Sequence, residues 1–187
     1  MTVKEFKFQY ALGTLSYDDL LKIANTSTSK EILTILSSHN KDWYIKYRVA
    51  KNPNTPKKIL TKLSENKDWY IRKGVAENSR TPKKILTKLS KDKEWYIRTE
   101  VALNPNAPVN ILTKLSKDKI SDVRKSVANN HNTPIKVLIT LSKDEDEFVR
   151  YSVATSSNTP TKIVIKLSKD RNYFVRDRAK KNLKESK

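Results

Sequence analysis

The feature that most constrains this 187-residue sequence is a repeat with a period of 26 residues. The segment "DWYIRKGVAENSRTPKKILTKLSKDK" is followed at once by "EWYIRTEVALNPNAPVNILTKLSKDK". One arginine recurs at the same place in five successive units: Arg72, Arg98, Arg124, Arg150 and Arg176. A fixed period of this length predicts a row of similar units that bury their apolar faces against one another.

Each unit is expected to contain two short helices. The first begins at a Thr-Pro pair, where Thr55 suits the N-cap and Pro56 suits the first helical position. Its apolar stripe is formed by Ile59, Leu60 and Leu63. This segment is amphipathic, so it needs a neighbouring helix to cover one side.

The second helix is expected to begin near an acidic residue, such as Asp68 or Glu94, because a carboxylate is favoured at the positive end of the helix dipole. Val75 and the small Ala76 lie on its apolar side. Asn-rich turns such as residues 52–54 are expected to end it, because Asn tolerates the left-handed conformation.

These patterns predict an all-α protein, a right-handed α-helical solenoid of stacked two-helix repeats. We expect an aromatic N-terminal cap over residues 1–15, with apolar side chains at Val3, Phe6, Phe8 and Tyr10. About six repeats are expected over residues 16–176. Residues 177–187 are expected to form a C-terminal cap and basic tail, because Lys180 stands where the repeats have a buried alanine.

The stretch "VRKSVANNHNTPIKVLITLSKDED" resembles the leucine-rich repeat variant family, and the resemblance extends from about Asp42 to Asn182. Units of that family commonly have 24 residues; the two extra ones here fall where "WY" stands. Some members carry a cysteine-bound iron–sulfur cluster, but this chain has no cysteine and therefore cannot hold one. The resemblance implies a scaffold and leaves the activity open.

The spacing of aspartate and arginine also resembles that of short HEAT-like repeats. Asp118 and Arg124, like Asp144 and Arg150, stand six residues apart. In stacked repeats each aspartate could meet an arginine or backbone donors of the neighbouring unit. We therefore interpret these carboxylates as structural rather than catalytic.

Enzyme signatures are scarce. The two histidines, His39 and His131, are expected in loops without partners, and the chain has two glycines, too few for a phosphate-binding loop. We therefore expect no catalytic residue, no metal and no cofactor. HEAT-like alkylpurine DNA glycosylases also use aromatic residues and an aspartate on a solenoid, but no extended match to them is found, so that activity ranks third.

The net charge of +19 comes from 39 Lys and Arg against 20 Asp and Glu, and it favours a polyanionic partner. The alternative is the codon bias of an AT-rich genome. Without a signal-peptide core or membrane-length apolar run, we expect a cytoplasmic monomer with no membrane partner.

The lysines recur on the exposed side of each first helix, which predicts a cationic row roughly 40–50 Å long over five units. Such a row would contact phosphates without reading sequence, or it would be a solvated face that keeps the protein soluble. Lysines close to helix N-termini oppose the dipole there, which favours a functional role. The row consists of Lys58, Lys62, Lys84, Lys88, Lys91, Lys114, Lys117, Lys136, Lys143, Lys162, Lys166 and Lys169.

Trp43, Trp69 and Trp95 share one position of the repeat, which later units fill with serine, glutamate and tyrosine. A position that accepts such different residues is not deep core. The tryptophans therefore either form a stacking surface for a partner or cover the seam between units. The next position, occupied mostly by Tyr and Phe, is expected to be half-buried packing.

Taken together, these features favour a non-enzymatic scaffold that binds DNA or RNA largely independently of sequence. The alternative is a protein–protein adaptor that grips an acidic partner.

Overall fold

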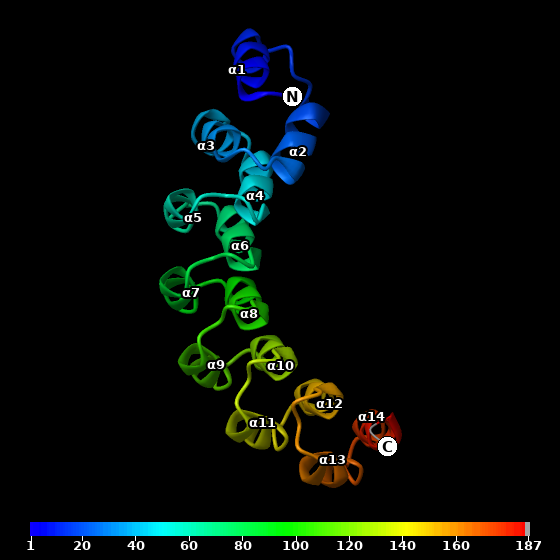
Figure 1. The fold of residues 1–187 in the computed structure, drawn as a ribbon. Coiled ribbons are helices and arrows are strands. Elements are labelled where there is room, and N and C mark those ends of the chain that lie inside the picture. Colours follow the sequence, from blue (N-terminus) through cyan, green and yellow to red (C-terminus); the bar gives the residue numbers. More distant parts are fainter. Residues whose placement is uncertain (186–187) are drawn as a thin grey trace. The chain divides into compact units, whose positions relative to one another are not determined.

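The computed structural model describes residues 1–185, and within them it shows fourteen α-helices and no strand (Figure 1). Ser186 and Lys187, the end of the expected C-terminal cap, lie outside the described residues. The helices are α1 (Val3–Leu12), α2 (Tyr17–Thr26), α3 (Lys30–His39), α4 (Trp43–Lys51), α5 (Lys57–Leu63), α6 (Trp69–Glu77), α7 (Lys83–Leu89), α8 (Trp95–Leu103), α9 (Val109–Leu115), α10 (Ser121–Asn129), α11 (Ile135–Leu141), α12 (Glu147–Thr155), α13 (Thr161–Leu167) and α14 (Tyr173–Glu185).

The chain divides into two compact units, unit 1 with α1 to α7 (Met1–Leu89) and unit 2 with α8 to α14, from Ser90 onwards. In unit 1, α2 packs on α4 and α4 on α6; in unit 2, α8, α10, α12 and α14 pack in succession. The odd-numbered helices form a second row beside them (Figure 1). The predicted all-α solenoid of two-helix repeats is confirmed, while the boundaries of the caps and of a single repeat domain stay predictions.

The core is built from the apolar positions that the repeat predicts. Leu60, Val75 and Ala76 are fully buried in unit 1, and Leu112 and Val127 are fully buried in unit 2. At the N-terminus, by contrast, three of the four apolar residues that were expected to form the cap are not buried. Phe6 is buried and its ring stacks on that of Tyr10, with centroids 5.3 Å apart, but Phe8 is exposed.

The threonine before each proline does not cap the first helix as expected. Pro56 occupies the N-cap of α5 and no side chain caps that helix. The Thr55 hydroxyl instead donates to the Val49 carbonyl at the end of the preceding helix, at 2.5 Å, and Thr133 does the same to Val127. These buried threonines therefore satisfy a carbonyl that the end of a helix leaves without a partner.

The second helices begin and end where predicted, but asparagine acts for a different reason than expected. Asp68 caps α6 by accepting from the Tyr70 N–H, whereas Glu94 makes no such bond to α8. Asn130 ends α10 with a φ of −79°, and within residues 1–185 no residue other than a glycine has a positive φ. The left-handed turn was therefore a wrong expectation.

A buried asparagine side chain instead ties a repeat to the one before it, except at α12, where Ser156 holds this position. Asn130 Nδ2 donates to the carbonyls of Ala102 and Asn104 at 2.6 and 3.0 Å, and its Oδ1 accepts from the Asn132 N–H at 2.8 Å. In unit 1, Asn78 Nδ2 donates to the carbonyls of Ala50 and Asn52. The asparagine thus hydrogen-bonds backbone groups 26 to 28 residues away, inside the core.

Candidate binding surfaces

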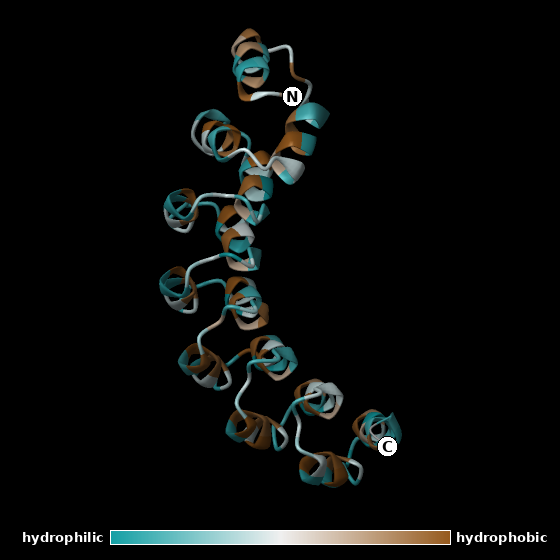
Figure 2. Ribbon diagram, viewed as in Figure 1, coloured by the Kyte–Doolittle hydropathy of each residue, from teal (hydrophilic) through white to brown (hydrophobic). Residues whose placement is uncertain are grey.

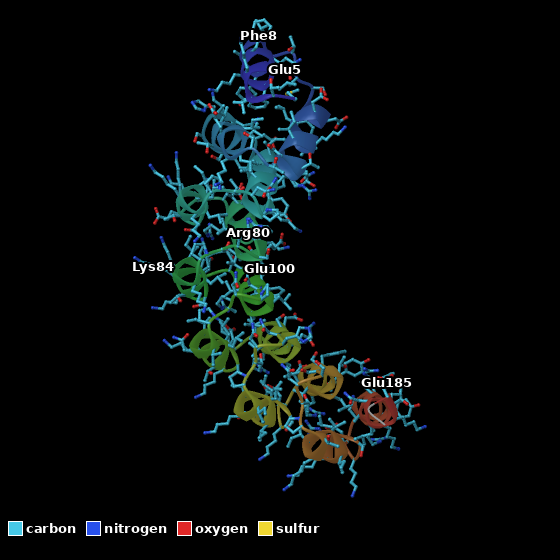
Figure 3. All side chains as sticks on the ribbon, in the orientation of Figure 1. Glu5, Phe8, Arg80, Lys84, Glu100 and Glu185 are labelled. Atoms are coloured by element: carbon cyan, nitrogen blue, oxygen red, sulfur yellow. The ribbon has the colours of Figure 1, made fainter. Side chains whose placement is uncertain are left out.

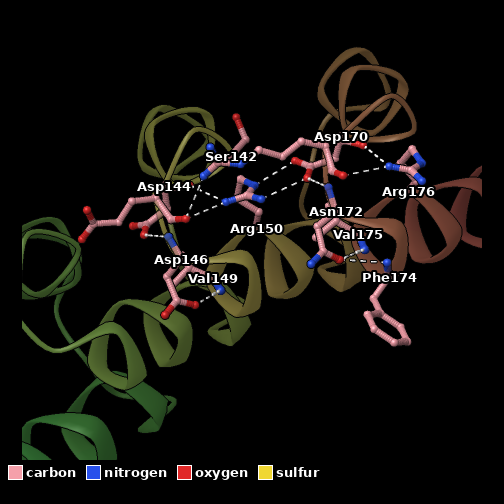
Figure 4. Close-up of polar contacts among 12 residues, drawn as sticks. Ser142, Asp144, Asp146, Val149, Arg150, Asp170, Asn172, Phe174, Val175 and Arg176 are labelled. Carbon is pink, nitrogen blue, oxygen red and sulfur yellow. Dashed lines mark hydrogen bonds and ion pairs between the residues drawn. The ribbon is translucent and has the colours of Figure 1, made fainter.

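The repeated aspartates and arginines form a chain of buried ion pairs in unit 2 (Figure 4). Arg150 Nε and Nη2 donate to the two carboxylate oxygens of Asp170 at 2.8 and 3.0 Å. Its Nη1 donates to the carbonyls of Asp144 and Glu145, in its own repeat. Arg98 with Asp118 and Arg124 with Asp144 repeat this arrangement.

Each aspartate of this chain also accepts a backbone hydrogen bond, as Asp144 Oδ1 does from the Asp146 N–H at 3.0 Å. Burial alone would raise the pKa of Asp144, but the hydrogen bonds from Arg124 and from the Asp146 N–H outweigh it and hold the pKa below its ordinary value. The expectation that these aspartates meet an arginine of the neighbouring unit is confirmed for Asp118, Asp144 and Asp170.

All twelve lysines of the predicted row are exposed. We call Lys58, Lys62, Lys84 and Lys88 the lysine surface of unit 1. Lys84, labelled in Figure 3, points away from the ribbon of α7. Lys88 is engaged, because its Nζ lies 2.7 Å from the Glu65 carboxylate, which also stands in the row. A groove of about 470 Å³ between α5 and α7 is lined in part by Lys84, Lys88 and Glu65.

The lysine surface of unit 2 is more uniformly basic, since no acidic residue stands at its positions in the row, whereas Glu65 stands in the row of unit 1. None of its members forms an ion pair within the described residues of the chain. It consists of Lys91, Lys114, Lys117, Lys136, Lys143, Lys162, Lys166 and Lys169.

Sequence reasoning missed a group of aliphatic side chains between these lysines. Val109, Ile135, Ile139 and Ile165 are 38 to 55% exposed, and brown covers more of α9, α11 and α13 than of α5 and α7 (Figure 2). The same repeat positions hold Lys57 or Thr61 in unit 1. That change from Lys or Thr to Val or Ile was the available signal.

The tryptophans lie at the surface of the even-numbered row. Trp43 and Trp95 are 43 and 40% exposed, and Trp69 is half-buried. In unit 1 the Tyr70 ring lies 4.6 Å from Trp43 and 3.4 Å from Trp69, between centroids, so the rings of α4 and α6 form one cluster. The Trp43 ring therefore contacts the next repeat and is also partly exposed, so both interpretations of the tryptophans stay predictions.

Beside this cluster, the two helices approach closely at Gly74. A Cβ there would lie 2.8 Å from the Tyr47 carbonyl oxygen and 3.1 Å from the Ala50 Cβ. The Tyr47 hydroxyl donates to Glu77 at 2.8 Å. Burial and this hydrogen bond raise the pKa of Tyr47 to about 12.

The position after the tryptophans was expected to be half-buried, but it is not half-buried in every repeat. Tyr44 and Tyr96 are half-buried, but Tyr70 is 40% exposed, and Phe148 and Phe174 are 64 and 70% exposed. His39 was also wrongly placed in a loop, since it is the last residue of α3; both it and His131 are exposed. No group of residues suited to hold a metal occurs in the described part of the chain.

None of the helices in residues 1–185 is long and apolar enough to span a lipid bilayer. No protein-family model matches the chain, and no curated protein matches it. Among solved structures, an engineered protein with 18% identity and a TM-score of 0.50 shares the fold; the match covers 89% of this chain and 62% of that one.

The structure is also similar to a leucine-rich repeat variant described as having a novel repetitive structural motif. The identity is 25% and the TM-score 0.67, over 94% of this chain and 70% of that one. The resemblance to leucine-rich repeat variants is therefore confirmed, and the chain has the fold of a helical repeat scaffold.

Proposed function

We propose that the chain is a non-enzymatic scaffold that binds nucleic acid, DNA or RNA, through its exposed lysines and without reading sequence. The observation that carries this proposal is the lysine surface of unit 2, whose eight lysines are all exposed and form no ion pair within the described residues. Four of them lie on α9, α11 and α13, which contain no acidic residue, and the other four stand two residues beyond the ends of α7, α9, α11 and α13. Lysine attracts phosphate as a point charge, whereas base reading favours the guanidinium fork of arginine.

The deciding experiment is a salt series of binding to duplex DNA and to single-stranded RNA, with the parent chain and with the triple variant Lys136→Glu, Lys162→Glu and Lys166→Glu. Each phosphate contact on a duplex contributes about −0.9 to the log–log salt slope, so the variant should lose up to about three such contacts. Its helicity and urea midpoint should stay unchanged, because exposed substitutions usually alter stability by no more than about 0.5 kcal/mol.

A matched control reverses the same number of charges elsewhere, at the exposed residues Lys4, Lys22 and Lys41. The two triple variants have the same net charge, so a difference between them reports position rather than total charge. If both lose affinity equally, attraction to the whole chain explains the binding and the proposed surface does not. If neither loses affinity, the lysine surface is a solvated face.

The second candidate is an adaptor for an acidic protein, and the exposed aliphatic residues between the lysines favour it. A phosphate backbone gains little from Ile135 or Ile139, whereas an acidic amphipathic helix would cover both these and Lys136. The double variant Ile135→Ser and Ile139→Ser keeps every charge. It should leave nucleic-acid affinity intact, and a loss of affinity there would contradict a purely phosphate-directed surface.

The tryptophans belong to this proposal only as a second contact area. Trp43→Ala removes a ring that is 43% exposed and leaves the charges untouched. If stacking on bases contributes, single-strand affinity should fall by about 1–3 kcal/mol with little change for duplex. Unchanged single-strand affinity together with lower stability would mean that Trp43 only covers the seam.

A further inference from the structure

A second kind of site lies in unit 2, on the even-numbered row rather than on the lysine surface. A pocket of about 370 Å³ opens between α12 and α14, and we call it the aromatic pocket. Phe174 projects from the start of α14, where its N–H donates to Asn172 Oδ1 at 2.8 Å (Figure 4). The lining residues are Glu147, Phe148, Tyr151, Asn172, Phe174 and Val175.

Three of these residues present aromatic side chains that are partly exposed. Phe148, Tyr151 and Phe174 are 64, 41 and 70% exposed. The neighbouring repeat has no such set, because α10 carries Ser121, Asp122 and Lys125 at the corresponding positions. Unit 1 carries Tyr44, Tyr47 and Tyr70 at the same positions, but Trp43 stands there in the place of Glu147 and its ring lies against Tyr70.

The charge at the aromatic pocket is negative, whereas the chain as a whole is positive. In a protein of net charge +19, the lining contains one carboxylate, that of Glu147, and no lysine or arginine. The nearby cations are already engaged. Arg150 is bound to Asp170, the Lys181 Nζ lies 2.9 Å from Asp177, and the Arg176 guanidinium lies over the Tyr173 ring.

Aromatic faces carry negative charge density and attract cations, and they do so best for ammonium groups that lose little hydration when they leave water. Methyl groups on nitrogen reduce that loss and also pack against rings. We propose that the aromatic pocket binds a methylated ammonium group between the rings of Phe148, Tyr151 and Phe174, with the Glu147 carboxylate supplying the counter-charge. This proposal does not depend on nucleic-acid binding.

Two sources of such a group are possible, a free quaternary ammonium compound and a methylated lysine side chain of a partner. We would titrate the full-length, isotope-labelled chain with choline and follow the NMR signals of Phe148, Tyr151 and Phe174. A second arm uses a short peptide with trimethyl-lysine and the same peptide with unmodified lysine. Tighter binding of the trimethyl-lysine peptide than of choline would identify a protein side chain as the source, and the reverse order a free compound.

The neutral isostere 3,3-dimethylbutan-1-ol has the shape of choline without its charge and should bind at least about fivefold more weakly. Phe148→Ala and Glu147→Gln should each weaken choline binding by a similar factor, and both residues are exposed, so folding is preserved. Trp95→Ala is the matched control, because Trp95 holds the place of Glu147 in an earlier repeat.

Equal binding of choline and its isostere would overturn the proposal, since the pocket would then be merely apolar. The proposal would also be overturned if choline shifts none of the three rings' signals, or if Phe148→Ala and Trp95→Ala weaken choline binding equally.

Discussion

The chain of buried ion pairs in unit 2 can be tested by removing one guanidinium. Arg150→Ala deletes four hydrogen bonds: two to Asp170 and one each to the carbonyls of Asp144 and Glu145. The Asp170 side chain is 9% exposed and would keep the Asn172 N–H as its backbone donor. Leaving a buried charge without its partner costs about 3–5 kcal/mol.

The chain itself supplies the matched control. Arg176 holds the same place in the next repeat and donates to the carbonyls of Asp170 and Arg171, but it forms no ion pair among the described residues. Arg176→Ala should therefore cost about 1–2 kcal/mol, the net value of two hydrogen bonds. Because Arg176→Ala also removes the contact of its guanidinium with the Tyr173 ring, the difference between the two variants is a lower limit for the contribution of the ion pair with Asp170.

Urea unfolding followed by far-UV circular dichroism gives the comparison. With an m-value of about 2 kcal/mol/M, a loss of about 3 kcal/mol lowers the midpoint by about 1.5 M. Urea is preferred to guanidinium chloride because the latter is a salt and screens charges. If Arg150→Ala and Arg176→Ala lower the midpoint equally, the ion pair contributes nothing beyond its backbone hydrogen bonds, and the reasoning is wrong.

Three further predictions concern stability. Asn130→Ala removes three hydrogen bonds and should cost about 2–4 kcal/mol in urea unfolding, whereas Asn132→Ala, which loses one exposed bond to Pro105, should cost less than about 1 kcal/mol. Gly74→Ala gains helix propensity of about 1 kcal/mol but drives a Cβ into the Tyr47 carbonyl, so thermal melting should show a net loss; a rise in Tm would contradict that close approach. Because the pKa of Asp144 is lower when folded than when unfolded, its ion pair stabilises the protein above the ordinary Asp pKa of about 3.9 and this contribution is lost as the pH falls below it; urea midpoints between pH 7 and pH 2 should show the loss, and Arg124→Ala should reduce it.

Much of the fold could be predicted from the sequence because equivalent positions in successive repeats carry similar residues. The burial of Leu60, Val75 and Ala76 follows from the 26-residue columns and the helical period, both local in sequence. The role of Asn130 could not be predicted in this way. Its amide reaches carbonyls 26 to 28 residues earlier, so its function exists only once two repeats have packed.

The candidate sites were less predictable, because exposure depends on which neighbours cover a side chain. The repeat pattern placed the lysines outside, since they alternate with buried residues on short helices. It could not show that Phe148 and Phe174 are 64 and 70% exposed, whereas the equivalent Tyr70, which lies against two tryptophan rings, is 40% exposed. The same dependence explains why the exposure of Ile135 was missed.

The ion-paired arginines and the row lysines of unit 2 occupy different environments. This difference limits the kind of partner that the lysine surface can bind. The guanidinium groups of Arg98, Arg124 and Arg150 are bound to aspartates and carbonyls inside unit 2, where their planar fork suits two-point hydrogen bonding. The lysines, which cannot form that fork, stand outside. A partner of the lysine surface therefore meets diffuse positive charge rather than groups that read bases. Binding that discriminated strongly between sequences at moderate salt would have to use other residues, and it would count against the lysine surface as the principal contact.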